Sequence, residues 1–118
     1  MRYVMLIYTD QEADARRSEE ERNAIWEAYG AYSADVYGRG VAKGGEALQP
    51  VTMATTVRVR NGDVLKTDGP YVETKEQLGG FYLMECGDLD EAIELASKLP
   101  SATYGSIEIR PVIEMDME

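Results

Sequence analysis

Residues 54–67, ATTVRVRNGDVLKT, carry the clearest structural signal in the chain. β-Branched and charged side chains alternate on both sides of Asn61-Gly62, and both residues of that pair tolerate the positive φ angles of a two-residue turn. The stretch therefore predicts a β-hairpin. The next residues, Asp68-Gly69-Pro70-Tyr71, predict a further turn, because aspartate caps its own backbone, glycine bends the chain and proline cannot donate a ladder hydrogen bond.

The half of the chain before this hairpin has the pattern strand, helix, strand. Residues 3–8 are nearly all apolar, which is typical of a strand in the middle of a sheet. Residues 18–21, Ser-Glu-Glu-Glu, have the spacing of a helix capping box, and the apolar stripe that follows ends near Gly38 and Gly40. Residues 41–48 predict a second strand, in which Gly44-Gly45 indicates a bulge or a close approach of two backbones.

The half after the hairpin repeats this pattern. Residues 79–86 predict a central strand, Asp88 begins a second amphipathic helix that Pro100 ends, and residues 106–110 alternate as a half-exposed strand. We therefore expect one α+β domain over residues 1–118, in the order β-α-β, hairpin, β-α-β. If both helices cover one face of the sheet, a second copy of the chain would cover the other. The sequence thus predicts a homodimer, with a curled monomeric sheet as the alternative.

Composition restricts the classes of function. The chain has 12 basic and 22 acidic residues, a net charge of −10, and such a surface repels nucleic-acid phosphates and anionic membrane lipids. It has no histidine and one cysteine, Cys86, which we expect to be a buried thiol. The usual ligands of zinc, copper and haem are therefore lacking, and we expect neither a metal nor a cofactor. No apolar run approaches the roughly 20 residues of a membrane span, so a cytoplasmic protein is the expectation.

Several segments match one family pattern: GGEALQP (44–50), ATTVRVRNG (54–62), TDGPYVETKEQLGGFYL (67–83), DLDEAIELA (88–96) and SIEIRPV (106–112). Together they resemble the DGPF branch of the YCII-related family, with Tyr71 in place of the phenylalanine of the Asp-Gly-Pro-Phe turn. The resemblance implies a ferredoxin-like subunit with an extra β-hairpin that pairs into a dimeric α+β barrel. Some relatives are proposed to be enzymes with a His–Asp pair, which this chain cannot form. Genes of the branch often lie beside those of extracytoplasmic-function sigma factors, which implies a regulatory setting.

The segment 67–80 is where we expect chemistry. Asp68 and Glu73 are the candidate catalytic residues, because a carboxylate acts as a general base without histidine when its surroundings raise its pKa. The candidate ligand-binding residues are Glu46, Gly69, Pro70, Tyr71, Lys75 and Glu76. The charged candidates also have a structural interpretation: Asp68 as a turn cap, the charges of residues 73–76 as a solvated face, and Glu46 as an outward-facing strand residue.

Three hypotheses for the function follow. The first is a cofactor-independent enzyme, in which a cleft beside the dimer interface holds a small organic molecule and a carboxylate moves a proton. The second is a ligand-sensing or regulatory module with the same cleft and no turnover. The third is a protein-interaction dimer in which the Asp-Gly-Pro-Tyr turn only shapes the fold. The sequence identifies neither the ligand nor a reaction.

Overall fold

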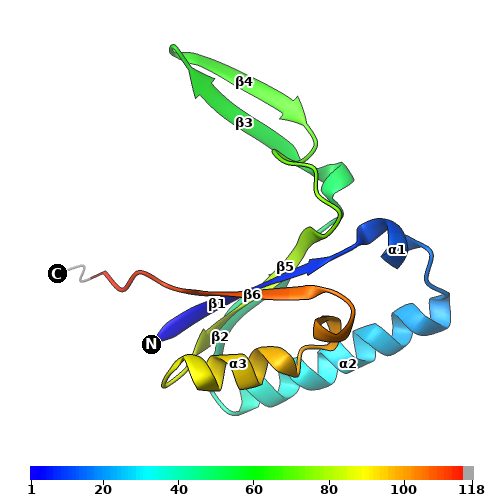
Figure 1. Ribbon diagram of the computed structural model, residues 1–118, viewed down its shortest axis with the longest axis vertical. Helices are drawn as coiled ribbons and strands as arrows, with labels where there is room; N and C mark the ends of the chain where they lie inside the picture. Colours follow the sequence, from blue (N-terminus) through cyan, green and yellow to red (C-terminus); the bar gives the residue numbers. More distant parts are fainter. Residues whose placement is uncertain (116–118) are drawn as a thin grey trace.

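The structure, a computed structural model, describes residues 1–115, so the last three residues of the predicted domain lie outside it. The main sheet is antiparallel, with the order β2-β5-β1-β6. Its strands are β1 (Arg2–Thr9), β2 (Ala42–Ala47), β5 (Gln77–Glu85) and β6 (Ser106–Pro111). The two apolar strands, β1 and β5, are central, as predicted. With a long helix after β1 and another helix after β5, this strand order is that of a ferredoxin-like α+β fold (Figure 1).

Two helices, α2 (Glu19–Gly38) and α3 (Leu89–Ser97), lie on one face of the main sheet (Figure 1). The core forms between these helices and the sheet, and its largest fully buried side chains are Met5, Met84, Leu99 and Val36. Tyrosine hydroxyls at its border are hydrogen-bonded, since Tyr32 donates to the carbonyl of Leu95 at 2.8 Å. Within residues 1–115, no helix combines the length and the apolar character that crossing a membrane requires.

Both long helices begin at the predicted caps. The Ser18 side chain accepts a hydrogen bond from the Glu21 amide at 3.1 Å, and the Glu21 carboxylate accepts one from the Ser18 amide, which completes the capping box. Asp88 caps α3 by accepting a hydrogen bond from the Glu91 amide at 2.9 Å, and the Glu91 carboxylate accepts one from the Gly87 amide at 3.3 Å. The predicted apolar stripe of α3 is only partly buried: Leu89 and Ile93 are half exposed, while Ala92, Leu95 and Ala96 face the core together with Leu99 beyond the helix end.

The segment before α2 contains a short helix, α1 (Gln11–Ala15), that we did not predict. Asp10 caps it by accepting hydrogen bonds from the amides of Glu12 and Ala13. The helix is held to the end of β1, where Thr9 donates to the Asp14 carboxylate at 2.6 Å. The segment is almost entirely polar, so the hydrophobic periodicity that predicts helices was absent.

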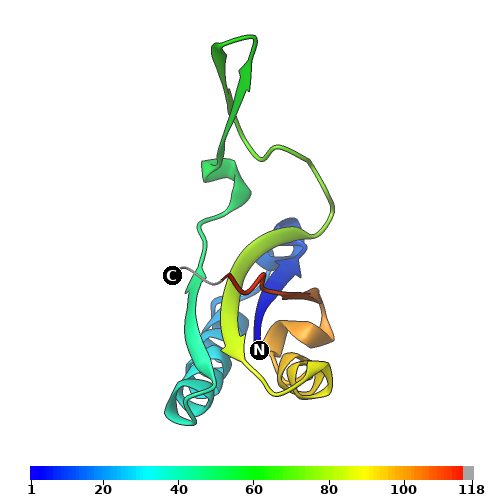
Figure 2. The same cartoon turned by 90° about the vertical axis from the view of Figure 1, so that its left-hand side faces the viewer.

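The hairpin forms where the sequence predicted it, with β3 (Thr55–Arg60) and β4 (Asp63–Asp68) joined by Asn61 at φ 52° and Gly62 at φ 81°. It follows a 3₁₀ turn, η1 (Val51–Met53), and makes a two-stranded sheet separate from the main sheet. We call residues 55–68 the arm and the rest of the described chain the body. Figures 1 and 2 show the arm projecting from the body on the side of the main sheet opposite α2 and α3.

The glycines of β2 and β5 let these strands approach each other closely. A Cβ on Gly45 would lie 2.6 Å from the carbonyl oxygen of Phe81, and one on Gly80 would lie 3.0 Å from that of Glu46. The ladder also shifts register between Ala42 and Gly44. The predicted bulge and close approach in β2 are therefore both present, and of the two glycines at the start of β5 it is Gly80 that needs to be glycine.

Candidate functional site

The Asp-Gly-Pro-Tyr turn closes the base of the arm. Gly69 adopts φ 103°, a conformation that favours glycine, and its amide donates to the carbonyl of Ala54 at 2.7 Å. The Thr56 hydroxyl donates to the Gly69 carbonyl at 2.8 Å. Both ends of the hairpin are thereby fixed to each other, and the residues after Gly69 are directed back toward the main sheet.

A hollow of about 420 Å³ lies beside this turn, between the turn, α1 and η1. Two carboxylates line it, Glu12 from α1 and Glu73 from the loop after the turn. The remaining lining residues are uncharged: Val51, Thr52, Gly69, Pro70, Thr74 and Gln77. Gln11 stabilises one wall, because its side-chain oxygen accepts a hydrogen bond from the Val51 amide at 3.0 Å. The hollow is open to solvent and acidic, so it suits a ligand with hydrogen-bond donors or a positive charge.

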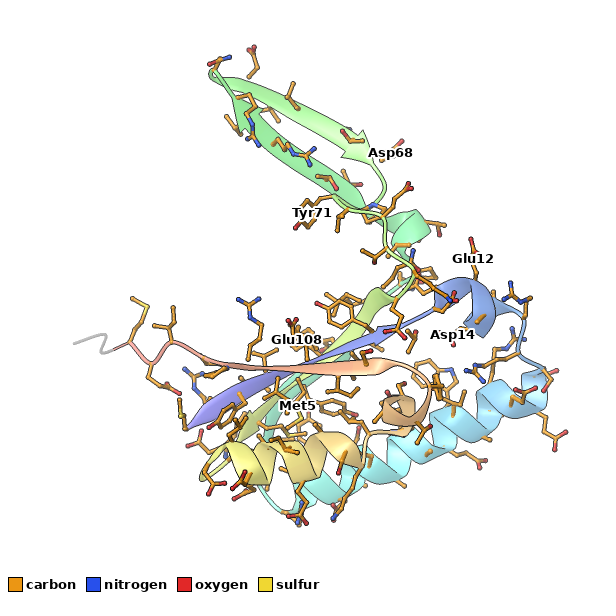
Figure 3. All side chains as sticks on the ribbon, in the orientation of Figure 1. Met5, Glu12, Asp14, Asp68, Tyr71 and Glu108 are labelled. Atoms are coloured by element: carbon orange, nitrogen blue, oxygen red, sulfur yellow. The ribbon has the colours of Figure 1, made fainter. Side chains whose placement is uncertain are left out.

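The second feature is the face of the main sheet that α2 and α3 leave open. Strand alternation and the β1–β5 register place Val4, Leu6, Phe81 and Leu83 together on this face, and each is partly exposed. Met5 and Met84 point to the helices instead. Figure 3 shows Met5 on the helix side of the sheet and Glu108 on the side of the arm. Among the described residues, no helix covers this face, which we call the open face.

Polar side chains gather at the end of the open face that lies nearest the turn. Tyr8 donates a hydrogen bond to the Glu108 carboxylate at 3.2 Å, and Ser106 donates to the Glu76 carboxylate at 2.6 Å. These contacts join β1, β6 and the loop before β5. Tyr71, a residue that is 76% exposed, lies between the arm and the open face (Figure 3). We call Tyr8, Glu76, Ser106 and Glu108 the polar end of the open face.

The pKa of the Tyr8 phenol is raised above its usual value. Burial is the largest cause, and the negative charge and hydrogen bond of Glu108 act in the same direction, while Arg110 opposes them. Tyr8 therefore keeps its proton at neutral pH and acts as a hydrogen-bond donor. Tyr71 also raises this pKa, by the smallest of these electrostatic effects.

The structure brings the predicted residues to three places. Gly69, Pro70 and Glu73 line the hollow. Glu76 belongs to the polar end, and Tyr71 lies above it. The other three are solvent-exposed: Asp68 at the end of β4, Lys75 in the loop, and Glu46 on the open face of the edge strand β2, opposite Phe81. Their catalytic and binding roles stay predictions.

Sequence reasoning missed Glu12, Tyr8, Ser106 and Glu108. The alternation of residues 106–110 placed Glu108 on the exposed side of a strand, but nothing local indicated that this strand would pair with β1 next to Tyr8. Glu12 lies in the helix that the sequence did not predict. In the part of the chain that the structure describes, no three cysteine, aspartate or glutamate side chains converge in a way that would hold a metal ion.

Strand order, helices and open face together define a ferredoxin-like α+β fold with one covered and one open sheet face. A family model described as the YCII-related domain matches residues 1–116. An uncharacterised protein of Rhizobium meliloti (strain 1021) is 38% identical in an alignment over 114 residues that covers 95% of this chain and 92% of that protein. The chain belongs to the YCII-related family, and the resemblance seen in its sequence is confirmed at that level.

Proposed function

We propose that this protein is a homodimer that binds a small organic molecule between Tyr71, in the Asp-Gly-Pro-Tyr turn, and the polar end of the open face. The observation that carries the proposal is the open face itself. It combines an apolar floor, formed by Val4, Leu6, Phe81 and Leu83, with hydrogen-bonding groups at one end. Ligand sites typically have this composition, in which apolar area supplies affinity and a few polar groups fix the orientation.

The surface area of the molecule supports the dimer. A compact monomer of 13.1 kDa exposes about 6,400 Å², whereas this chain exposes 8324 Å². The excess, about 1,900 Å², is larger than the roughly 800 Å² that each partner contributes to a standard interface. A second copy that covered the open face would return the exposed area per chain to the normal range.

The chemistry of the polar end indicates the ligand class. Two carboxylates, Glu76 and Glu108, accept hydrogen bonds there, and Tyr71 offers an aromatic ring for stacking. The ligand that fits best has an aromatic or aliphatic body and an amine or hydroxyl group that donates to these carboxylates. Aromatic amines and phenols meet both conditions.

A thermal-shift screen of the purified protein against aromatic amines and phenols tests the binding proposal. A ligand present at 100 times its dissociation constant adds about 2.7 kcal/mol to stability and raises the midpoint by several degrees. We expect Glu108→Gln to weaken the hits and Glu27→Gln, which removes an exposed carboxylate on α2 at the other side of the sheet, to leave them unchanged. Equal shifts in both variants would contradict the proposed site.

Light scattering tests the dimer, with Leu6→Asp on the open face and Trp26→Asp on α2 as a matched control. Both variants add one negative charge in place of an apolar side chain, and Trp26 is itself exposed. We expect the first to dissociate the dimer and the second to keep it. A wild-type protein that stays monomeric at micromolar concentration would refute the homodimer without any need for variants.

Proton transfer by a carboxylate is a second candidate function, favoured by the pairing of Glu12 and Glu73 around one hollow. In this function, the hollow holds the reacting group and Glu73 takes or gives the proton without a cofactor. Any hit from the screen is incubated with the protein and followed for product by mass spectrometry. We expect turnover to be lost in Glu73→Gln and kept in Asp68→Asn, since Asp68 lies outside the hollow.

A further inference from the structure

The arm has the properties of an element that is completed by another molecule. Every residue of β4 is exposed, and so is every residue of β3 apart from Thr56. A two-stranded hairpin of this kind is marginally stable by itself in water. The radius of gyration, 16.4 Å, exceeds the approximately 13.5 Å of a compact chain of this length, and the arm is the visible protrusion in Figure 2.

The two faces of the arm differ in chemistry. The pairing of Val59 with Val64 and of Val57 with Lys66 puts the three valines on one face. Their exposed fractions are 59% for Val57, 57% for Val59 and 71% for Val64. The opposite face carries Arg58, Arg60 and Leu65. A cluster of three exposed valines on one face indicates a surface that packs against something apolar.

The position of the arm limits what that partner is. The arm stands on the same side of the main sheet as the open face (Figures 1 and 3). Any molecule seated on the open face therefore lies alongside the arm. If that molecule is a second copy related by a two-fold axis, the contact is reciprocal, because each arm then lies against the other subunit.

Charge also favours a second copy of this chain. The arm holds three basic and two acidic residues, whereas the whole chain holds 12 basic and 22 acidic ones. Two such acidic bodies repel each other, and a net-positive element that extends from one to the other reduces that repulsion.

We propose that the arm is a clasp between subunits: its valine face, Val57, Val59 and Val64, packs against the body of a second copy of the same chain, and each subunit clasps the other. This inference rests on the proposed homodimer. It adds a second contact surface, the valine face of the arm, to the one that the open face provides. The Asp-Gly-Pro-Tyr turn then has a defined task, since its hydrogen bonds fix the base from which the arm extends.

A pair of substitutions on opposite faces of the arm tests the clasp. Val59→Asp places a charge on the valine face, and Leu65→Asp places the same charge on the arginine face. Burial of one valine is worth about a tenfold change in an equilibrium constant, and a two-fold dimer contains it twice. We expect Val59→Asp to weaken dimerisation about a hundredfold in sedimentation equilibrium and Leu65→Asp to change it less than tenfold. Equal effects of the two would overturn the clasp.

Hydrogen exchange on the unaltered protein gives an independent measurement. We expect the amides of residues 55–68 to be protected at concentrations where the dimer forms and to exchange rapidly on dilution. The clasp is refuted, and the homodimer stands, if these amides exchange freely in the dimer or if Val59→Asp leaves the dimer intact. The arm would then bind a different partner. A monomeric wild type refutes both proposals at once.

Discussion

A methyl group added at Gly45 would meet the carbonyl oxygen of Phe81 at 2.6 Å, whereas one added at Gly44 would have open space around it. The neighbouring residues are therefore a matched pair. We expect Gly45→Ala to lower the free energy of unfolding by about 1–3 kcal/mol, the usual cost of forcing atoms into a packed site, because β2 must move away from β5. Gly44→Ala should change it by less than about 0.5 kcal/mol. Urea denaturation of both variants measures the difference, and equal losses would contradict the close approach.

Tyr8 and Glu108 give a pH-dependent prediction at the same scale. Because the folded-state pKa of Tyr8 is raised, first by burial and then by Glu108, its protonated form stabilises the fold. That contribution is present below about pH 10, the pKa of an unperturbed tyrosine, and is lost as the pH rises from there through the raised pKa. We expect Glu108→Gln to lower the Tyr8 pKa toward its usual value and Glu46→Gln to leave it unchanged. Nuclear magnetic resonance of ring-labelled tyrosine follows the titration, and a Tyr8 pKa unaffected by Glu108→Gln would disprove the assigned cause.

Among the elements, α2 offers a direct test of a sequence signal. Ser18 and Glu21 form the capping box that their spacing predicted. We expect Ser18→Ala to destabilise the protein by about 1 kcal/mol, since the amide of Glu21 loses its acceptor. The control is Ser97→Ala, at the last residue of α3. It removes only a hydroxyl that donates to the Glu94 carbonyl one turn earlier, so we expect it to be nearly neutral. Thermal unfolding monitored by circular dichroism compares the two, and a neutral Ser18→Ala would mean that the cap adds nothing.

The elements also show which features could be predicted from the sequence. The hairpin, the two long helices and the four strands of the main sheet depend on local chemistry: turn residues, caps and periodicity. The polar end depends on register between strands distant in sequence, and a shift of one residue would turn Glu108 toward the helices. That register follows from tertiary packing, which local sequence patterns do not encode. The segment 67–80 could therefore be predicted as part of the candidate site, whereas Tyr8, Ser106 and Glu108 could not.

At the scale of the whole molecule, the direction of the arm was the property that the sequence did not predict. The sequence Asn61-Gly62 indicates a hairpin but carries no information on the direction in which that hairpin extends from the main sheet. The direction of the arm depends on the hydrogen bonds that join Gly69 to Ala54 and Thr56. It also depends on the loop that follows, which is held to β6 by the hydrogen bond between Ser106 and Glu76. The whole molecule, arm included, is flat, with extents of 50 × 47 × 19 Å. A chain with this shape leaves a large part of its surface for contacts with other molecules.

Cys86 gives this protein a practical advantage in the laboratory. It is the single cysteine of the chain, only 2% of it is exposed, and burial raises the pKa of its thiol. An exposed thiolate attacks maleimide and methanethiosulfonate reagents, so the buried, protonated native thiol reacts slowly with both. A cysteine introduced at an exposed position such as Asp63, on the face of the arm opposite the valines, can therefore be labelled selectively without first removing Cys86. A dye or spin label at that position allows distances from the tip of the arm to be measured in a protein that is otherwise unaltered.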